Sequence, residues 1–213
     1  MSSRDSQRAY HHGNLRAELL EQGIVQLRDT SPEQLSLRAV ARALGVSQTA
    51  PYRHFNDKEA LLAAIAARGY GELLDDLRSA LGDTDGSAAG QLRRVARAYV
   101  DFASREEQLF KLMFGPLVQP SARYPELRTV SRETLLLVRA ILQHGMERGE
   151  FAPQDTLYLA NAAWAGIHGV ATLRIDAPAL FRKHIDLLRQ IDVAVDTFIE
   201  GIRPRLPWDS ANP

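Results

Sequence analysis

The chain has 213 residues, and its 26 Lys and Arg residues are balanced by 26 Asp and Glu residues, so the formal net charge is zero. Hydrophobic residues make up 45% of the chain, which is enough for a globular core and too much for a disordered protein. The absence of cysteine excludes disulfides, thiolate metal sites and cysteine nucleophiles. No apolar run approaches the roughly 20 residues of a membrane-spanning helix, and the N-terminus lacks the apolar core of a secretory signal. We therefore expect a cytoplasmic protein with no membrane partner.

Charge is distributed unevenly along the chain. Residues 1–58 hold eight basic and six acidic residues, and the remainder is slightly acidic. A mildly basic N-terminal part permits binding to nucleic acid without demonstrating it.

The first predicted helices are short. Apolar spacings of three and four predict a helix over 14–28, with Asn14 as its N-cap, and a second helix that Ser36 caps. Gly45 should end this second helix, because glycine adopts the left-handed conformation without steric cost. Ser47 is the expected cap of a third helix, and Asn56 that of a fourth over 58–81, with Glu59 completing a capping box.

The rest of the chain also has helical spacing, apart from a loop over 82–90 that is rich in Gly, Asp and Ser. We expect an all-α protein of about nine helices. The predicted domains are an N-terminal arm and DNA-binding domain over 1–60, a helical effector-binding and dimerisation domain over 61–204, and a tail over 205–213. The later helices are predicted over 88–104, 106–114, 126–149, 155–175 and 180–202.

Two short helices joined by a tight glycine turn predict a helix-turn-helix, although an ordinary helical hairpin has the same spacing. The residue types favour the first interpretation, because Thr49, Tyr52 and His54 would leave polar groups to satisfy in a core. Facing DNA, Gln48, Thr49 and Ala50 can meet base edges, and Tyr52, His54 and Lys58 can donate to phosphates. Pro51 fits near a helix start, where its missing N–H costs little, and we expect a short helix with a local distortion there.

The stretch "SLRAVARALGVSQTAPYRHFNDKEALLAAIA" closely resembles the DNA-binding domain of TetR-family transcriptional regulators. It departs from the family pattern at Pro51, where leucine is usual. The resemblance implies that Ser36 and Arg38 hold the first helix of the motif against the DNA backbone, while Arg53 can be a contact or a solvated residue. The candidate DNA-binding residues are Ser36, Arg38, Ser47, Gln48, Thr49, Ala50, Tyr52, Arg53, His54 and Lys58.

The preceding segment "RAYHHGNLR" resembles a basic arm that some family members place on DNA, and a polar tail without contacts is the alternative. The adjacent His11 and His12 lack further ligands, so we expect no metal site and no cofactor.

In the C-terminal half, "LANAAWAGIHGVATL" (159–173) resembles the Trp-x-Gly-x-His-Gly signature of one type of TetR-family C-terminal domain. Helical spacing places Asn161, Trp164 and His168 on one face, which suits either an effector pocket or a packed core pair. The Met and aromatic cluster of "FKLMFG" is either core or the lining of an apolar cavity. The candidate effector-pocket residues are Tyr99, Phe110, Met113, Phe114, His144, Asn161, Trp164 and His168.

The resemblance also implies that the last two long helices form a four-helix bundle with a second subunit, whereas packing within one subunit is the alternative. Two symmetry-related reading heads would bind a pseudo-palindromic double-stranded operator. We therefore expect a homodimeric repressor that an unknown small-molecule effector releases from DNA. A helical adaptor without DNA binding and a small helical enzyme are the alternatives, and no catalytic motif supports the enzyme.

Overall fold

The computed structural model describes residues 14–82 and 86–204, and within these ranges the chain is helical and contains no strand. The all-α prediction is confirmed, with nine α-helices in the described ranges. Predictions for the N-terminal arm, including His11 and His12, and for the tail over 205–213 lie outside the described residues. No described helix has the length and apolar run that a membrane crossing requires.

The chain divides into two compact units, which do not coincide with the two sequence-based domains. One comprises Met1–Tyr70 and Glu106–Thr129, and the other Gly71–Arg105 and Val130–Pro213. The division into a DNA-binding domain over 1–60 and an effector-binding and dimerisation domain over 61–204 remains a prediction.

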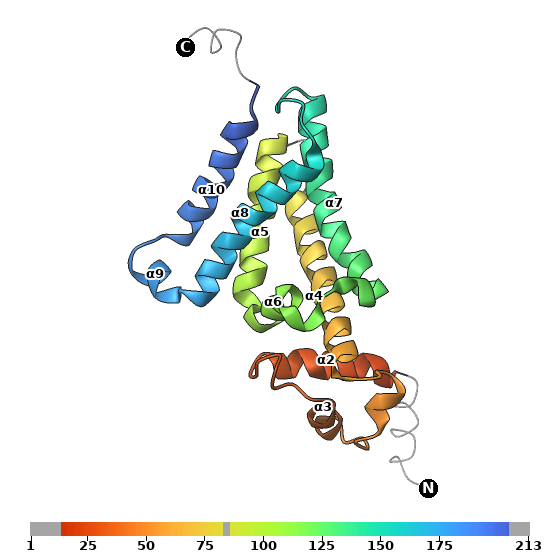
Figure 1. Cartoon of the computed structure of the whole chain (residues 1–213). Coiled ribbons are helices and arrows are strands. Elements are labelled where there is room, and N and C mark those ends of the chain that lie inside the picture. The colour runs from red at the N-terminus through yellow and green to blue at the C-terminus, as the bar shows by residue number, and fades with distance from the viewer. Residues whose placement is uncertain (1–13, 83–85, 205–213) are drawn as a thin grey trace. The chain divides into compact units, whose positions relative to one another are not determined.

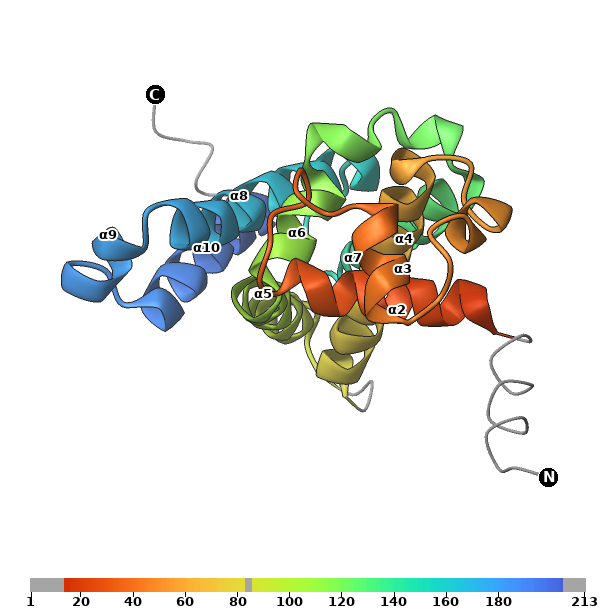
Figure 2. The ribbon, with the colours of Figure 1, turned by 90° about the horizontal axis from the view of Figure 1, so that it is seen from below.

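The first unit is built on α2, which packs against α3 and the 3-10 turn η1 (Figures 1 and 2). Its core joins Leu19 of α2, Val40 of α3 and Phe55 to the first half of α4, where Leu61 and Ile65 are fully buried. The elements that contribute to this unit are α2 (Leu15–Leu27), α3 (Leu37–Ala43), η1 (Ala50–Arg53), α4 (Lys58–Leu81), α6 (Glu107–Phe114), η2 (Pro116–Val118), η3 (Ser121–Arg123) and α7 (Pro125–Glu147).

In the second unit, α5, α8 and α10 pack against one another, and α9 follows α8 (Figure 1). The inward residues of α10, among them Ile191, Val195 and Ile199, are buried by neighbours of the same subunit. Besides parts of α4 and α7, this unit contains α5 (Ala88–Arg105), α8 (Thr156–Asp176), α9 (Pro178–Lys183) and α10 (Leu187–Ile202).

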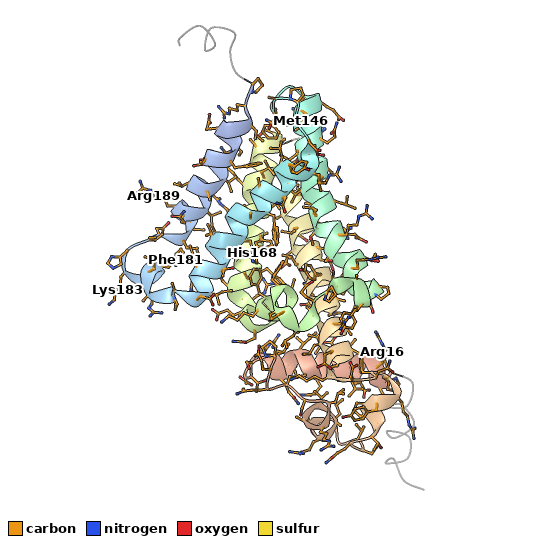
Figure 3. The ribbon with its side chains drawn as sticks, in the orientation of Figure 1. Arg16, Met146, His168, Phe181, Lys183 and Arg189 are labelled. Carbon is orange, nitrogen blue, oxygen red and sulfur yellow. The ribbon has the colours of Figure 1, made fainter. Side chains whose placement is uncertain are left out.

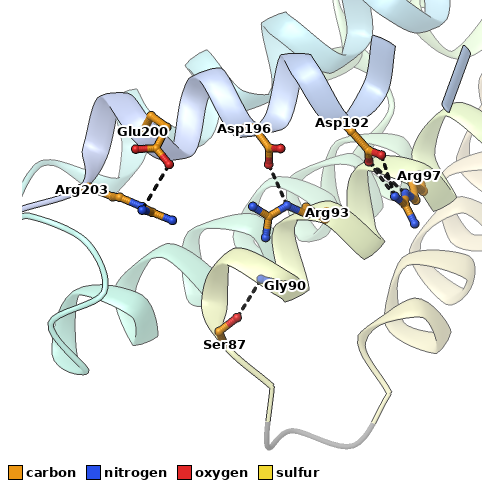
Figure 4. A network of polar contacts seen from close by, with 8 residues as sticks. All are labelled: Ser87, Gly90, Arg93, Arg97, Asp192, Asp196, Glu200 and Arg203. Atoms are coloured by element: carbon orange, nitrogen blue, oxygen red, sulfur yellow. Dashed lines mark hydrogen bonds and ion pairs between the residues drawn. The ribbon is translucent and has the colours of Figure 1, made fainter. Parts of the chain in front are cut away.

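Two arginines on α5 and two aspartates on α10 form two ion pairs, which we call the clasp (Figure 4). Arg93 Nε lies 2.7 Å from Asp196 Oδ1, and Arg97 Nη2 lies 2.7 and 2.9 Å from the two carboxylate oxygens of Asp192. The two arginines are four residues apart on α5, and the two aspartates are four residues apart on α10. Residues at this spacing lie on the same side of a helix, so one side of α5 faces one side of α10.

Two predicted helix boundaries are wrong for local reasons. The single helix expected over 180–202 is two helices, because the Asp186 carboxylate accepts from the Arg189 N–H at 2.8 Å and starts a new helix. At α4, Asp57 rather than Asn56 caps the helix, since its Oδ1 accepts from the Ala60 N–H at 2.7 Å.

Candidate functional site

Helix α3 has the two ends that the sequence predicts. The Ser36 hydroxyl accepts from the Ala39 N–H at 3.1 Å, so Ser36 is the N-cap. At the other end Gly45 has φ 67°, its N–H donates to Arg42, and the Val46 N–H donates to Ala41. This pair of hydrogen bonds is a Schellman motif, which turns the chain sharply toward the next segment.

The next segment is a 3-10 turn over Ala50–Arg53, and Pro51 explains why. An α-helical start would need a hydrogen bond from residue 51 to the Ser47 carbonyl, which proline cannot donate. Instead the Ala50 N–H donates to that carbonyl at 3.0 Å, which is the tighter 3-10 pattern. The predicted short helix with a local distortion is therefore confirmed, and its role in recognising DNA remains a prediction.

The prediction that Ser47 caps this helix is wrong. Its hydroxyl lies 3.2 Å from the Thr49 hydroxyl, and residues 47–49 precede the helical turn. Gln48 and Thr49 consequently lie in the turn that directly precedes η1.

This segment has two buried residues beside runs of exposed ones. Pro51 and Phe55 are buried and anchor the turn, whereas the Tyr52 side chain is 48% exposed. Arg38, Ser47, Gln48, Thr49, Arg53 and His54 are also exposed, and Ala50 is half-buried. The polar side chains are thus presented outward from a fixed apolar base, and their individual roles on DNA remain predictions.

Lys58 has a contact that the sequence did not indicate. Its ammonium donates to the backbone carbonyl of Glu33, in the segment before α3. An ammonium has three donors, so this contact positions the side chain while its phosphate role remains a prediction. Arg16 lies near the start of α2 (Figure 3). Its guanidinium carbon is 5.5 Å from the centroid of the Phe55 ring.

In the second unit, three of the candidate effector residues form one hydrogen-bonded group. Trp164 Nε1 donates to the Tyr99 hydroxyl at 3.1 Å, and that hydroxyl lies 2.9 Å from His168 Nδ1. The Trp164 and His168 rings on α8 lie 5.1 Å apart between centroids. Burial lowers the pKa of His168. Tyr99 is only 6% exposed, whereas Trp164 is 37% exposed, so the group extends from the interior to the surface.

The other candidates are not part of this group. Asn161 and His144 are exposed in the second unit. Phe110, Met113 and Phe114 belong to the first unit, where Phe110 and Met113 are buried core residues. Burial also raises the pKa of Tyr70, whose ring contacts Phe114 edge-on at 5.4 Å. A pocket role for these residues remains a prediction.

Sequence reasoning missed the clasp, although its signal is visible as Arg93 and Arg97 on one helix and Asp192 and Asp196 on another. The sequence does not indicate that the arginines contact the aspartates, because the paired residues are about a hundred positions apart.

Two stretches of the chain match known protein families. Residues 19–65 match the family described as "Bacterial regulatory proteins, tetR family". Residues 92–198, half of the chain, match "Tetracyclin repressor-like, C-terminal domain". The chain belongs to the TetR family of transcriptional regulators.

The uncharacterised regulator YobS of Bacillus subtilis is 25% identical over 168 residues, covering 79% of this chain and 82% of that protein. A regulator from Mycobacterium tuberculosis is 31% identical over 121 residues, covering 56% of this chain and 51% of its own. A solved structure of a protein of unknown function from Rhodococcus sp. RHA1 is 33% identical, with a TM-score of 0.80 and coverage of 92% and 98%. The structure of FadR from Bacillus halodurans, at 18% identity and a TM-score of 0.71, shows the shared fold alone.

Proposed function

We propose that the protein is a homodimeric repressor that binds a pseudo-palindromic double-stranded operator and releases it when a small-molecule effector binds. The observation that carries the proposal is the exposed polar surface over 47–54, held outward by the buried Pro51 and Phe55. A polar surface on a rigid apolar base suits contacts with base edges and phosphates. We propose that Gln48, Thr49 and Ala50 face bases and that Tyr52, His54 and Lys58 face the DNA backbone.

The outer faces of α8 and α10 support dimerisation. The Tyr158 side chain is 73% exposed, and Leu173, Leu188 and Val193 are all more than half exposed. Gly166, Gly169 and Gly201 lie within these helices, and no described neighbouring atom lies within 4 Å of the position that a Cβ would take. A glycine within a helix lowers the stability of the protein by about 0.5–1 kcal/mol relative to alanine. Packing within the described part of the subunit does not require glycine at these positions. On helices that also expose apolar side chains, these open glycines suit the close approach of a second copy, and TetR-family regulators act as dimers.

We propose that the effector contacts the exposed part of the Trp164–His168 pair, and that the C-terminal half belongs to the Trp-x-Gly-x-His-Gly type. The sequence left open a packed core pair. The partial exposure of Trp164 favours a contact role, because a core tryptophan would be buried. An effector can shift the equilibrium between DNA-binding and released shapes only by its difference in affinity for the two. We propose no catalytic activity.

A mobility-shift titration with the DNA upstream of the protein's own gene tests the repressor proposal. The expected result is saturable, salt-sensitive binding that unlabelled specific DNA competes away. Absence of binding to this fragment and to any sequence recovered by selection from a genomic library would favour an adaptor without DNA binding.

A further inference from the structure

Arg16, at the start of α2, contacts two segments of the first unit that are distant from it in the sequence. Its guanidinium carbon lies over the Phe55 ring, 5.5 Å from the ring centroid, which is within the range of a cation–π contact. Its Nη2 also lies 3.3 Å from Glu126 Oε2, at the start of α7. One guanidinium therefore joins an acidic residue of α7 to the aromatic residue that ends the turn over 50–55, which we call the reading turn.

The reading turn has few hydrogen bonds of its own. It is a 3-10 turn, whose hydrogen-bond geometry is poorer than that of an α-helix, and Thr49 makes no side-chain cap bond at its start. The Pro51 carbonyl accepts from the N–H groups of His54 and Phe55, both at 2.9 Å. The Phe55 side chain is only 4% exposed, so the pose of the turn depends on what holds this ring.

Resting on the proposed DNA-binding function, we propose that Arg16 and Glu126 are positioning residues for the reading turn. The Glu126 carboxylate orients the Arg16 guanidinium, and the guanidinium holds Phe55 and with it the turn in the pose that meets DNA. An acidic side chain thereby favours binding to a polyanion.

The expected effect is modest, because both contacts are partly exposed. The side chains of Arg16 and Glu126 are 49% and 70% accessible, so solvent screens their attraction. Loss of the cation–π contact and the ion pair together should shift the equilibrium between poses by about threefold to tenfold. DNA affinity falls by no more than this factor, because it follows the fraction of molecules in the competent pose.

The salt dependence of DNA binding separates positioning from direct contact. We expect Arg16→Gln to weaken binding about threefold on every sequence, with the same slope of affinity against salt as the wild type. A residue that binds phosphate itself would reduce the slope by about one when removed. A reduced slope, or undiminished affinity, overturns the proposal.

Glu126→Gln gives a test in which charge repulsion predicts the opposite sign. Removing an acid from a DNA-binding unit should by itself leave binding unchanged or tighten it, whereas loss of the positioning contact should weaken it about twofold. Glu21→Gln is the matched control, because Glu21 is an exposed acid of the same unit that pairs with Arg68 at 3.6 Å. Equal or tighter binding by Glu126→Gln overturns the proposal.

The double variant tests whether the two residues act in series. Arg16→Gln combined with Glu126→Gln should bind DNA no more weakly than Arg16→Gln alone, because the carboxylate acts only through the guanidinium. Losses that add fully would show that Glu126 acts independently of Arg16, and would overturn the proposal.

Nitrogen-15 relaxation of the free full-length protein tests the pose without DNA. In Arg16→Gln we expect increased relaxation dispersion or shifted resonances at the amides of Tyr52 and Arg53, which do not neighbour Arg16 in the sequence. The Val40 amide, in the middle of α3, is the internal control and should not change. Unchanged amides in the turn, or an equal change at Val40, overturn the proposal.

The same preparations are used in the mobility-shift titration. DNA binding by the wild-type protein together with any overturning result means that this inference alone fails. Absence of DNA binding by the wild-type protein means that the proposed function fails, and the relaxation measurement then tests by itself whether Arg16 holds the turn.

Discussion

Tyr52 lies at the exposed surface, with 48% of its side chain accessible, directly after the buried Pro51. We expect Tyr52→Phe to weaken DNA binding about tenfold on every sequence, because a hydrogen bond to a charged phosphate is worth roughly 1.5–3 kcal/mol and carries no base information. Titration against specific and unrelated duplexes measures the effect. Tyr124→Phe, between η3 and α7 and outside the proposed DNA-binding and dimer surfaces, serves as the control. A loss confined to the specific duplex would show that Tyr52 reads bases.

His168 gives a prediction about pH. Its pKa is lowered in the folded protein by burial, so as pH falls through the ordinary histidine value of about 6.5 the unfolded chain gains this proton first. The free energy of unfolding should therefore decrease below that pH, and the decrease should end once the folded protein also binds the proton. Chemical denaturation of wild type and His168→Gln at pH values on either side of about 6.5 measures it.

His144, which is exposed on α7, supplies the matched control. His144→Gln should retain the pH dependence of the wild type. An equal slope in wild type and His168→Gln would show that burial of His168 is not its source.

At the scale of elements, Gly166 on α8 should respond to substitution in two opposite ways. Gly166→Ala should stabilise the isolated helix by about 0.5–1 kcal/mol, because alanine loses less backbone entropy. It should also weaken dimerisation about tenfold or more, since a methyl group at a close helix crossing costs roughly 1–3 kcal/mol. Denaturation and sedimentation equilibrium measure the two effects separately.

Gly71 offers the control, because it lies in α4 with the same open space around its Cβ position. Gly71→Ala should stabilise the protein without altering the dimer constant. Unchanged dimerisation in Gly166→Ala would remove α8 from the proposed interface.

The clasp between α5 and α10 should contribute a modest amount to stability. Arg97 and Asp192 are partly exposed, with 48% and 36% of their side chains accessible, so solvent screens their attraction. We expect a coupling of about 0.3–1 kcal/mol in a double-mutant cycle of Arg97→Ala and Asp192→Ala. The coupling should shrink in high salt. A value near zero at low salt would mean that apolar packing alone holds α10 in place.

Local chemistry was read correctly from the sequence where it depends on neighbouring residues. Ser36, Gly45 and Pro51 each act through bonds within a few positions, so the ends of α3 and the distorted turn were predictable. The cap assigned to Ser47 was wrong although it is also local, because the helical turn begins only at Ala50. Asn56 and Asp57 are adjacent candidates for one cap, and the sequence alone did not decide between them. The Tyr99–His168 bond and the contact of Lys58 with Glu33 depend on how distant segments pack, which spacing does not encode.

At the scale of the whole molecule, repression requires two properties in one dimer. Each subunit must present an exposed reading surface, and the two surfaces must be held at a spacing that matches the operator half-sites. Within one subunit, α5 touches α8 through Tyr99 and α10 through Arg93 and Arg97. It thus links the proposed effector contacts to a proposed dimer helix.

The most direct test of the account is selection of binding sites from a random DNA library by wild type and by Gln48→Ala. We predict that the wild-type protein enriches a motif of two symmetric half-sites. The variant should fold and dimerise normally, because Gln48 is exposed, and should lose preference at the same base position in each half-site. Identical motifs from the two proteins, or no motif from the wild type, would contradict the claim that this surface reads operator DNA.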